Sequence, residues 1–254
     1  MIIIYIFIFL IGLALGSFLN VCIHRLPQGE SVIFPRSHCP ACGHKIKNLD
    51  NIPLISYLLL RGECRYCGWK IAWHYPLVEF ITPLILLGIF ILHGSSFNLL
   101  FFKYSVFYLI STAIFFTDLF RQMIPDRLSL ALMVSGVIFS LLPGNDISWL
   151  ESILSGLSIF SFFLILAYVF HKFTGKESLG GGDIKYLTAV AANLGWLGSL
   201  FTIMLGSILA LLILLISGHD HNKKFPFGPF LITGSLIFFL LKEFVLHNYL
   251  TFYK

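Results

Sequence analysis

Charge is scarce in this chain: only 11% of its 254 residues are Asp, Glu, Lys or Arg, whereas 57% are hydrophobic and 16% are aromatic. A soluble domain carries about 25% charge, so the composition excludes a large water-soluble catalytic domain. At roughly 20 apolar residues per crossing, the length allows about eight membrane spans and one small polar domain. The formal charge of +5 is better explained by orientation in a lipid bilayer than by nucleic-acid binding, and we expect no nucleic-acid partner.

Long apolar runs closed by polar clusters predict an all-α polytopic membrane protein with about eight transmembrane helices. The first run, 1–22, has no basic residue before it and no small-residue cleavage site, so we interpret it as a retained anchor rather than a signal peptide. The other predicted spans are 76–92, 98–117, 128–142, 149–170, 184–198, 200–217 and 228–246.

Lysine and arginine are missing from two loops between predicted spans, 93–98 and 143–148. Of the 17 basic residues, 14 lie in four other segments: 23–75, 118–127, 171–185 and 218–227. Basic loops stay on the cytoplasmic side of a membrane, so these four segments are predicted to face the cytoplasm. Lys103 lies inside a predicted span, and we expect its ammonium group to snorkel to the outer surface.

The predicted organisation has three parts. Residues 1–22 form the first transmembrane helix, 23–75 a small cytoplasmic zinc-knuckle domain, and 76–254 a seven-helix membrane domain.

The chain has only five cysteines, and four of them form a repeated C-x-x-C-G-x-K-I unit. The four are Cys39, Cys42, Cys64 and Cys67. Two knuckles of this spacing predict a closed tetrahedral zinc site, which is structural rather than catalytic. Two disulfides are the alternative, but a reducing cytoplasm favours metal. The segment has few aliphatic residues, so metal binding would supply the missing folding free energy.

Two carboxylates stand out among the twelve acidic residues because they adjoin apolar runs. Asp118 follows one such run, and Asp183 follows Gly180-Gly181-Gly182 directly before another. Ionisable groups at membrane depth are costly and usually mark function. The alternative is a structural role, with Asp183 as the N-cap of a helix starting at Ile184 and Asp118 paired with Arg121. Two such carboxylates on one side of the membrane favour a functional site over the structural role.

Two neighbouring carboxylates do not both ionise readily, so they would share a proton near neutral pH. Such a pair suits peptide hydrolysis, because the ionised group takes a proton from water while the protonated group polarises the scissile carbonyl. The three glycines would let a bound extended peptide approach the backbone closely. Asp126 is the rival for the role of Asp118, although Pro125 before it favours a cap or loop position.

Several ordered motifs together resemble the type IV prepilin peptidases, the bifunctional leader peptidases and N-methyltransferases of bacterial pilus, competence and type II secretion systems. The motifs are Gly16-Ser-Phe-Leu-Asn-Val21, His24-Arg-Leu-Pro27, the two cysteine knuckles, Asn51-Ile-Pro-Leu-Ile-Ser56, Leu60-Arg-Gly62, Tyr75-Pro-Leu-Val-Glu79, Phe116-Thr-Asp-Leu119, Ile124-Pro-Asp126 and Gly180-Gly-Gly-Asp-Ile-Lys185. The resemblance extends over nearly the whole chain and implies that Asp118 and Asp183 are the catalytic pair.

The resemblance also implies the reaction: cleavage of a basic prepilin or pseudoprepilin leader after a Gly at the cytoplasmic face of the bacterial inner membrane, then methylation of the new N-terminal amine with S-adenosylmethionine. It points to the cytoplasmic domain for methyl transfer, with Gly62 as a candidate for the cofactor site. The next position, commonly Lys in the family, is Glu63 here. The sequence has no Gly-x-Gly-x-x-Gly loop from which cofactor contacts follow.

A second interpretation of the sequence is a polytopic transporter with a structural zinc domain, because membrane-depth carboxylates also relay protons or cations. A secretion-system scaffold whose carboxylates only cap helices is a third. The glycine run before Asp183 favours peptide binding, and the membrane region shows no convincing internal repeat of the transporter kind.

Overall fold

The computed structural model describes residues 1–175, 180–217 and 225–252, with side chains as far as Lys242. The chain divides into two compact units, Met1–Phe97 and Asn98–Lys254. The helix His74–Leu92 therefore packs in the same unit as the first helix and the cysteine segment. The predicted functional boundaries, after residue 22 and after residue 75, stay a prediction.

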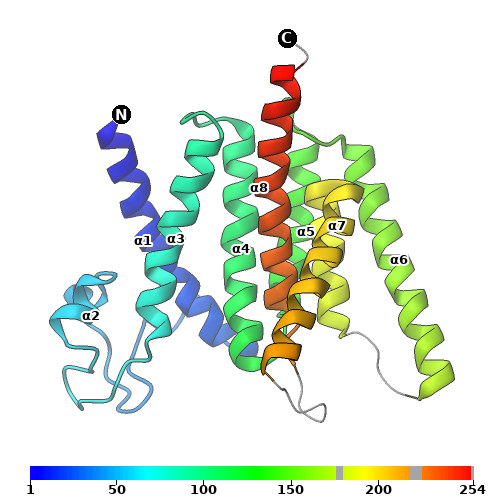
Figure 1. Ribbon diagram of the computed structural model, residues 1–254. Coiled ribbons are helices and arrows are strands. Elements are labelled where there is room, and N and C mark those ends of the chain that lie inside the picture. Colours follow the sequence, from blue (N-terminus) through cyan, green and yellow to red (C-terminus); the bar gives the residue numbers. More distant parts are fainter. Residues whose placement is uncertain (176–179, 218–224, 253–254) are drawn as a thin grey trace. The chain divides into compact units, whose positions relative to one another are not determined.

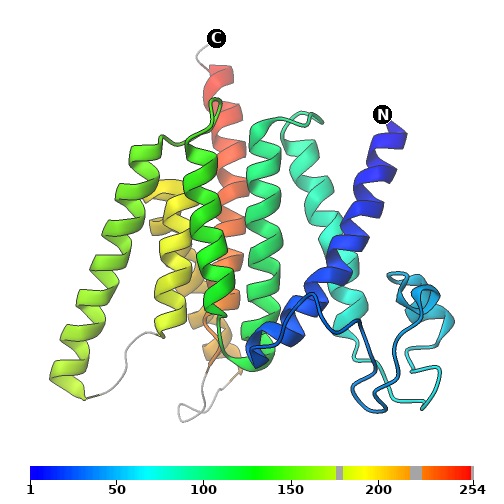
Figure 2. The same cartoon turned by 180° about the vertical axis from the view of Figure 1, so that it is seen from behind.

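Unit 1, Met1–Phe97, is built on two long helices that pack against each other (Figures 1 and 2). Its elements are α1 (Ile2–Arg25), the 3-10 turns η1 (Leu26–Gln28) and η2 (Asn48–Asn51), α2 (Ile55–Leu59) and α3 (His74–Leu92). Glycines make the close approach of α1 and α3 possible: a Cβ at Gly12 would lie 2.4 Å from Pro83 Cα, and one at Gly16 would lie 2.8 Å from Glu79 Cα. The cysteine segment between them has little regular structure.

Unit 2, Asn98–Lys254, is a bundle of helices that alternate in direction (Figures 1 and 2). Its helices are α4 (Leu99–Arg121), α5 (Asp126–Ser140), α6 (Trp149–Thr174), α7 (Gly181–Ser217) and α8 (Gly228–Phe252). The side chains of Asn98 and Ser148 accept backbone N–H groups from the first turns of α4 and α6, which fixes where these helices begin. Helix α7 packs against α5, α6 and α8, and α4 packs against α5 and α8.

Helix α7 is broken at Gly195, whose φ of +72° lies in the left-handed region. Its two arms run in opposite directions (Figure 1). L residues rarely adopt this conformation, so the break requires glycine; an added Cβ would also lie 2.5 Å from Glu151 Oε1. The sequence placed the reversal at residue 199, between two predicted spans. The structure corrects that position, because the positive φ needed for the reversal occurs at Gly195.

Five helices of the described residues are long and apolar enough to cross a membrane, by length and composition: α1, α3, α4, α6 and α7. The Gly228–Lys242 part of α8 is a shorter apolar helix, and α5 has 15 residues. The all-α class and the number of about eight helices are confirmed. The chain is a multi-pass membrane protein.

The end of unit 2 where α4 begins holds an ion cluster that the sequence did not indicate. Lys103 is fully buried and pairs with Asp146, in the loop between α5 and α6, and Lys242 of α8 pairs with the same carboxylate. The expectation that Lys103 snorkels outward is therefore wrong. Although burial acts to raise it, the two ammonium groups hold the pKa of Asp146 well below its usual value.

Candidate active site and metal centre

The two carboxylates singled out in the sequence lie at the same end of unit 2. Asp118 belongs to the last turn of α4, and Asp183 belongs to the first turn of α7. Because α4 ends where α7 begins (Figure 1), residues 65 positions apart in the chain meet at one end of the bundle. The two carboxyl groups are near enough to interact electrostatically.

Asp118 is 6% exposed, and its position is fixed by the start of another helix. The backbone N–H of Gly228, the first residue of α8, donates to Asp118 Oδ2 at 3.0 Å. A Cβ at Gly228 would lie only 2.7 Å from the same oxygen. Among the described side chains, no ion pair joins Asp118 to Arg121, so the structural alternative of a pair at the helix end is wrong.

Asp183 is partly exposed, so solvent can reach the site. Helix α7 begins at Gly181, and the N–H of Asp183 donates to the Gly180 carbonyl oxygen at 3.0 Å. Asp183 is therefore inside the first turn and is not the N-cap of a helix starting at Ile184. The exposed N–H groups and the dipole of a helix N-terminus favour a negative charge there.

Of the three glycines before Asp183, two have close neighbours and one faces open space. A Cβ at Gly180 would lie 3.1 Å from Asp183 Oδ2, and one at Gly182 would lie 3.0 Å from Ile124 Cβ. A Cβ at Gly181 would meet no atom within 4 Å. The backbone at Gly181 is thus accessible beside the carboxylates, as close binding of an extended peptide requires.

Asp126, the rival to Asp118, is placed differently. Its side chain is 74% exposed and forms an ion pair with Lys185 at 2.6 Å. It is the first residue of α5, and an acidic residue in a first helical turn is stabilised by the helix dipole. This geometry favours a structural role at the helix start.

Sequence reasoning missed Gly228 as a contact of the site. The residue stands between Pro226 and Pro229, immediately before an apolar run. A glycine enclosed by two prolines at the beginning of a span is a signal that could have identified it, because such a position indicates a constrained backbone near a neighbour.

The four knuckle cysteines converge in unit 1. Their sulfur atoms all lie within 4.8 Å of one another, and Cys39 Sγ and Cys67 Sγ are 3.8 Å apart. Tetrahedral zinc with Zn–S bonds of about 2.3 Å would separate two sulfurs by about 3.8 Å. All four are free thiols, so the alternative of two disulfides is not what the structure contains. The cluster could bind a metal ion such as zinc.

The two knuckles repeat one backbone pattern. Gly43 donates to the Cys39 carbonyl oxygen and Gly68 to that of Cys64, each at 2.9 Å, and both glycines have φ near +70°. Positive φ is the reason each turn needs glycine. The N–H groups of Tyr66 and Cys67 lower the pKa of the Cys64 thiol to about 7, whereas burial and the neighbouring cysteines raise that of Cys67, so one thiol of this pair ionises before the other. Cys22 is buried in α1 and does not belong to the cluster.

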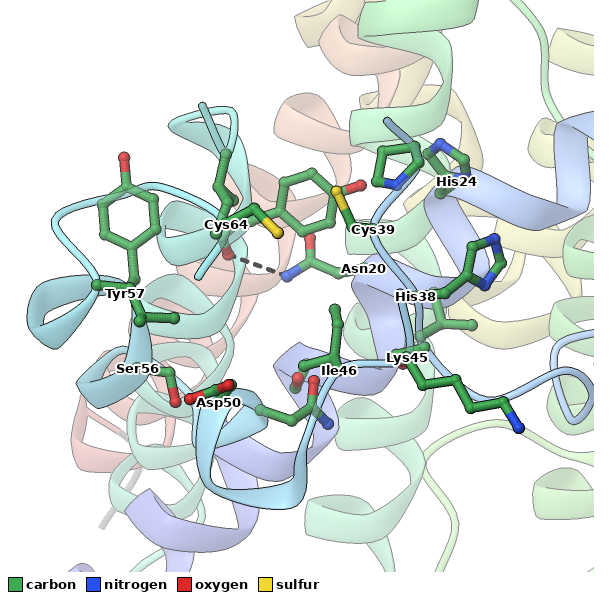
Figure 3. Close-up of a pocket in the computed structure, with 18 of the residues that line it drawn as sticks. Asn20, His24, His38, Cys39, Lys45, Ile46, Asp50, Ser56, Tyr57 and Cys64 are labelled. Carbon is green, nitrogen blue, oxygen red and sulfur yellow. Dashed lines mark hydrogen bonds between the residues drawn. The ribbon is translucent and has the colours of Figure 1, made fainter. Parts of the chain in front are cut away.

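Unit 1 also contains a cavity of about 620 Å³ next to the cysteine cluster. Figure 3 shows side chains of α1, of the cysteine segment and of α2 around it. Cys39 and Cys64 line the cavity, so the cysteine cluster forms part of its wall. Gly62 does not line it. Instead, with φ +71°, it lies under Tyr57: a Cβ at Gly62 would be 3.0 Å from the Tyr57 hydroxyl oxygen, and Tyr57 lines the cavity.

Comparisons with known proteins agree with this architecture. Residues 10–93 match the model of the bacterial peptidase A24 N-terminal domain, and residues 105–215 match that of the type IV leader peptidase family. Curated proteins named prepilin leader peptidase/N-methyltransferase are similar over most of their length. The one from Aeromonas hydrophila is 34% identical over 96% of this chain and 93% of its own length, and the one from Pseudomonas aeruginosa is 33% identical over 96% and 92%. No solved structure gives a significant match.

The fold and site define a polytopic membrane protein with a carboxylate pair in one unit and a cysteine cluster in the other. The chain belongs to the type IV leader peptidase family, as the resemblance in the sequence indicated. Membership in this family does not favour the transporter and scaffold alternatives.

Proposed function

We propose that this protein removes the leader of type IV prepilins or pseudoprepilins and then methylates the new N-terminus. The observation that carries the proposal is the carboxylate pair: Asp118, held by Gly228, and Asp183, at the accessible start of α7, interact at one end of unit 2. Its relatives carry the name prepilin leader peptidase/N-methyltransferase, which supports both activities.

In the proposed cleavage, one carboxylate of the pair is ionised and the other is protonated. The ionised group takes a proton from water as the water oxygen bonds to the scissile carbonyl carbon. The protonated group donates a hydrogen bond to the carbonyl oxygen. When the C–N bond breaks, its electron pair goes to nitrogen and a carboxyl proton goes to the leaving amine, so a new carboxyl group and a new amine form.

Gly180, Gly181 and Gly182 support this reaction by their small size. The open space at Gly181 lets peptide backbone approach Asp183 without meeting a side chain. The helix N-terminus behind Asp183 adds N–H groups that favour negative charge on the carboxylate or the carbonyl oxygen.

Methyl transfer is proposed for unit 1. When bound, S-adenosylmethionine would supply an electrophilic methyl group for the new N-terminal amine. Cys39, Cys42, Cys64 and Cys67 would hold a structural zinc ion, since a site of four thiolates leaves no open position for substrate. That ion would keep the cavity wall folded.

We place the protein in the bacterial inner membrane, with the carboxylate pair and the cysteine segment towards the cytoplasm. The support is the distribution of basic residues. Arg121 and Arg127 lie near the carboxylate end of unit 2, and the loop at the other end, 143–148, has neither lysine nor arginine.

The proposal is tested with reconstituted protein and a prepilin-like peptide. Asp118→Asn and Asp183→Asn should each lower leader release by roughly 10²–10⁴-fold, the range for loss of a general acid or base. Asp126→Asn, which removes an exposed carboxylate near the same end, should retain measurable activity. Full activity in either of the first two variants would contradict the proposal.

A further inference from the structure

The cavity in unit 1 has the size and lining of a small-molecule site. Its volume of about 620 Å³ lies within the usual range of roughly 300–1,000 Å³ for ligand pockets. Aromatic side chains line it together with polar ones; the aromatic ones include Tyr57, Tyr66 and Trp69. Flat aromatic faces suit an adenine ring, and their electron-rich surfaces attract cations.

Asn20 of α1 presents an unused hydrogen-bond acceptor in the cavity wall. The side chain is 5% exposed, and its Nδ2 donates to the Tyr75 carbonyl oxygen at 2.9 Å, as the dashed line in Figure 3 marks. Its Oδ1 is buried and has no partner. A buried polar atom without a partner is costly. Since Asn20 lines the cavity, a ligand N–H group is the natural donor to this oxygen.

Glu79 of α3 places a negative charge on the same cavity. The Leu54 N–H donates to Glu79 Oε2 at 2.9 Å, and the Ser17 hydroxyl donates to the carboxylate as well. These contacts from α1 and from the segment before α2 fix its orientation. Among the described residues Glu79 forms no ion pair, so its charge is available to a cationic ligand.

The backbone that contacts Glu79 is strained. Leu54 has φ +61° and ψ −48°, a conformation that L residues rarely adopt. Such strain is retained where surrounding contacts require it, often at ligand sites. Here it turns the Leu54 N–H towards Glu79, and it thereby fixes the carboxylate at the cavity.

We propose that this cavity is the methyl-donor site, in which Asn20 Oδ1 and the Glu79 carboxylate receive the positively charged, N–H-bearing methionyl part of S-adenosylmethionine. The inference rests on the proposed methyl transfer and adds where its cofactor binds. Basic side chains, Arg25 and Lys45, line the cavity as well and suit the carboxylate of the same methionyl part. The size of the cavity and its aromatic lining favour a nucleoside over a simple amine.

The test is equilibrium binding of labelled S-adenosylmethionine to the purified full-length protein in detergent. Glu79→Gln keeps the shape and an acceptor for the Leu54 N–H but removes the charge, and it should weaken binding by about 10-fold or more. Asn20→Leu should weaken it by a similar factor of about 10. Asp126→Asn is the control, because it also removes one carboxylate charge but lies in unit 2, is exposed and does not line the cavity, and its dissociation constant should match that of the unmodified protein.

Folding of the Glu79→Gln and Asn20→Leu variants is checked by melting temperature and metal content. Ultraviolet cross-linking of the labelled cofactor to unmodified protein should mark peptides that line the cavity. If Glu79→Gln binds as tightly as the unmodified protein, or if the label marks unit 2, the inference is overturned. If an excess of S-adenosylhomocysteine does not prevent labelling of the cavity, the cavity does not bind the methyl donor specifically and the inference is also overturned.

The inference and the proposed function fail in different ways. A protein that cleaves and methylates but is labelled outside the cavity loses only the inference. A protein that cleaves but transfers no methyl group to the mature peptide loses the proposed second activity.

Discussion

In each unit a backbone N–H group holds one carboxylate of a long helix in place, but the groups around the two carboxylates differ. In unit 1, Glu79 accepts a backbone N–H from Leu54, and in unit 2, Asp118 accepts one from Gly228. Glu79 then faces a cavity with an unpartnered amide oxygen, whereas Asp118 interacts with a second carboxylate, Asp183. A single fixed charge suits retention of a cation, while two interacting carboxylates suit proton transfer.

The supports of the two sites also differ. The wall of the unit 1 cavity includes two of the four clustered cysteines, so we expect the site to depend on the proposed metal ion. The unit 2 site is held by helix ends in a bundle whose buried hydroxyl groups bond to backbone carbonyl oxygens, as Ser155 does to Ala191 and Ser152 to Ala192. The two activities should therefore respond separately to perturbation.

Metal removal should produce the largest separation. Structural zinc supplies roughly 10 kcal/mol or more of folding free energy in small domains, so a chelator, or Cys39→Ser combined with Cys64→Ser, should abolish binding of S-adenosylmethionine. Leader cleavage in the same sample should fall far less. Cofactor binding measured against metal content checks this. Binding that survives complete removal of the metal would contradict the claim that the unit 1 site, unlike the unit 2 site, depends on metal.

Gly228→Ala should damage the cleavage site next most strongly. The new Cβ would lie 2.7 Å from Asp118 Oδ2, and a shift of about 1 Å in a reacting group can cost on the order of 10²-fold in rate. We expect leader release to fall by roughly 10–100-fold. Gly88→Ala is the control, because a Cβ there meets nothing within 4 Å. Equal rates for the two variants would show that Gly228 does not position Asp118.

Gly62→Ala should have a smaller effect, confined to the methyl-donor cavity. The Cβ would press on the Tyr57 hydroxyl at 3.0 Å, and the positive φ adds strain of about 1 kcal/mol. The dissociation constant of the cofactor should rise by about 3- to 10-fold. Gly29→Ala has the same backbone strain but no atom within 4 Å. An equal rise in both variants would assign the effect to strain rather than to Tyr57.

The smallest expected effect concerns stability at low pH. The folded-state pKa of Asp146 is lowered, so its pairs with Lys103 and Lys242 stabilise the fold above the ordinary carboxyl pKa of about 4 and lose that effect as the pH falls further. Asp146→Asn should lower stability by roughly 2–4 kcal/mol near neutral pH, because Lys103 remains buried without its partner. Melting temperature should depend less on pH between about 5 and 3 in the variant. An unchanged melting profile would refute this role.

The sequence predicted the elements that depend on local pattern. Apolar runs indicated the spans. The knuckle repeat indicated the cysteine cluster, because zinc ligands have a characteristic spacing in the sequence. The sequence did not reveal contacts between distant segments: the hydrogen bond from Gly228 to Asp118 joins residues 110 positions apart. Lys103 was misplaced for the same reason, since its partner Asp146 comes from another loop. The break in α7 was placed four residues late because the hydropathy pattern does not reveal φ at Gly195.

The most direct test of the central claim is whether Asp118 and Asp183 act as one unit. Leader release should be measured for Asp118→Asn, Asp183→Asn and the double variant under identical conditions. Groups that act together are strongly non-additive, so the double variant should be no slower than the slower single variant, within about 3-fold. Independent losses that multiply in the double variant, or near-normal cleavage in either single variant, would contradict a shared catalytic pair.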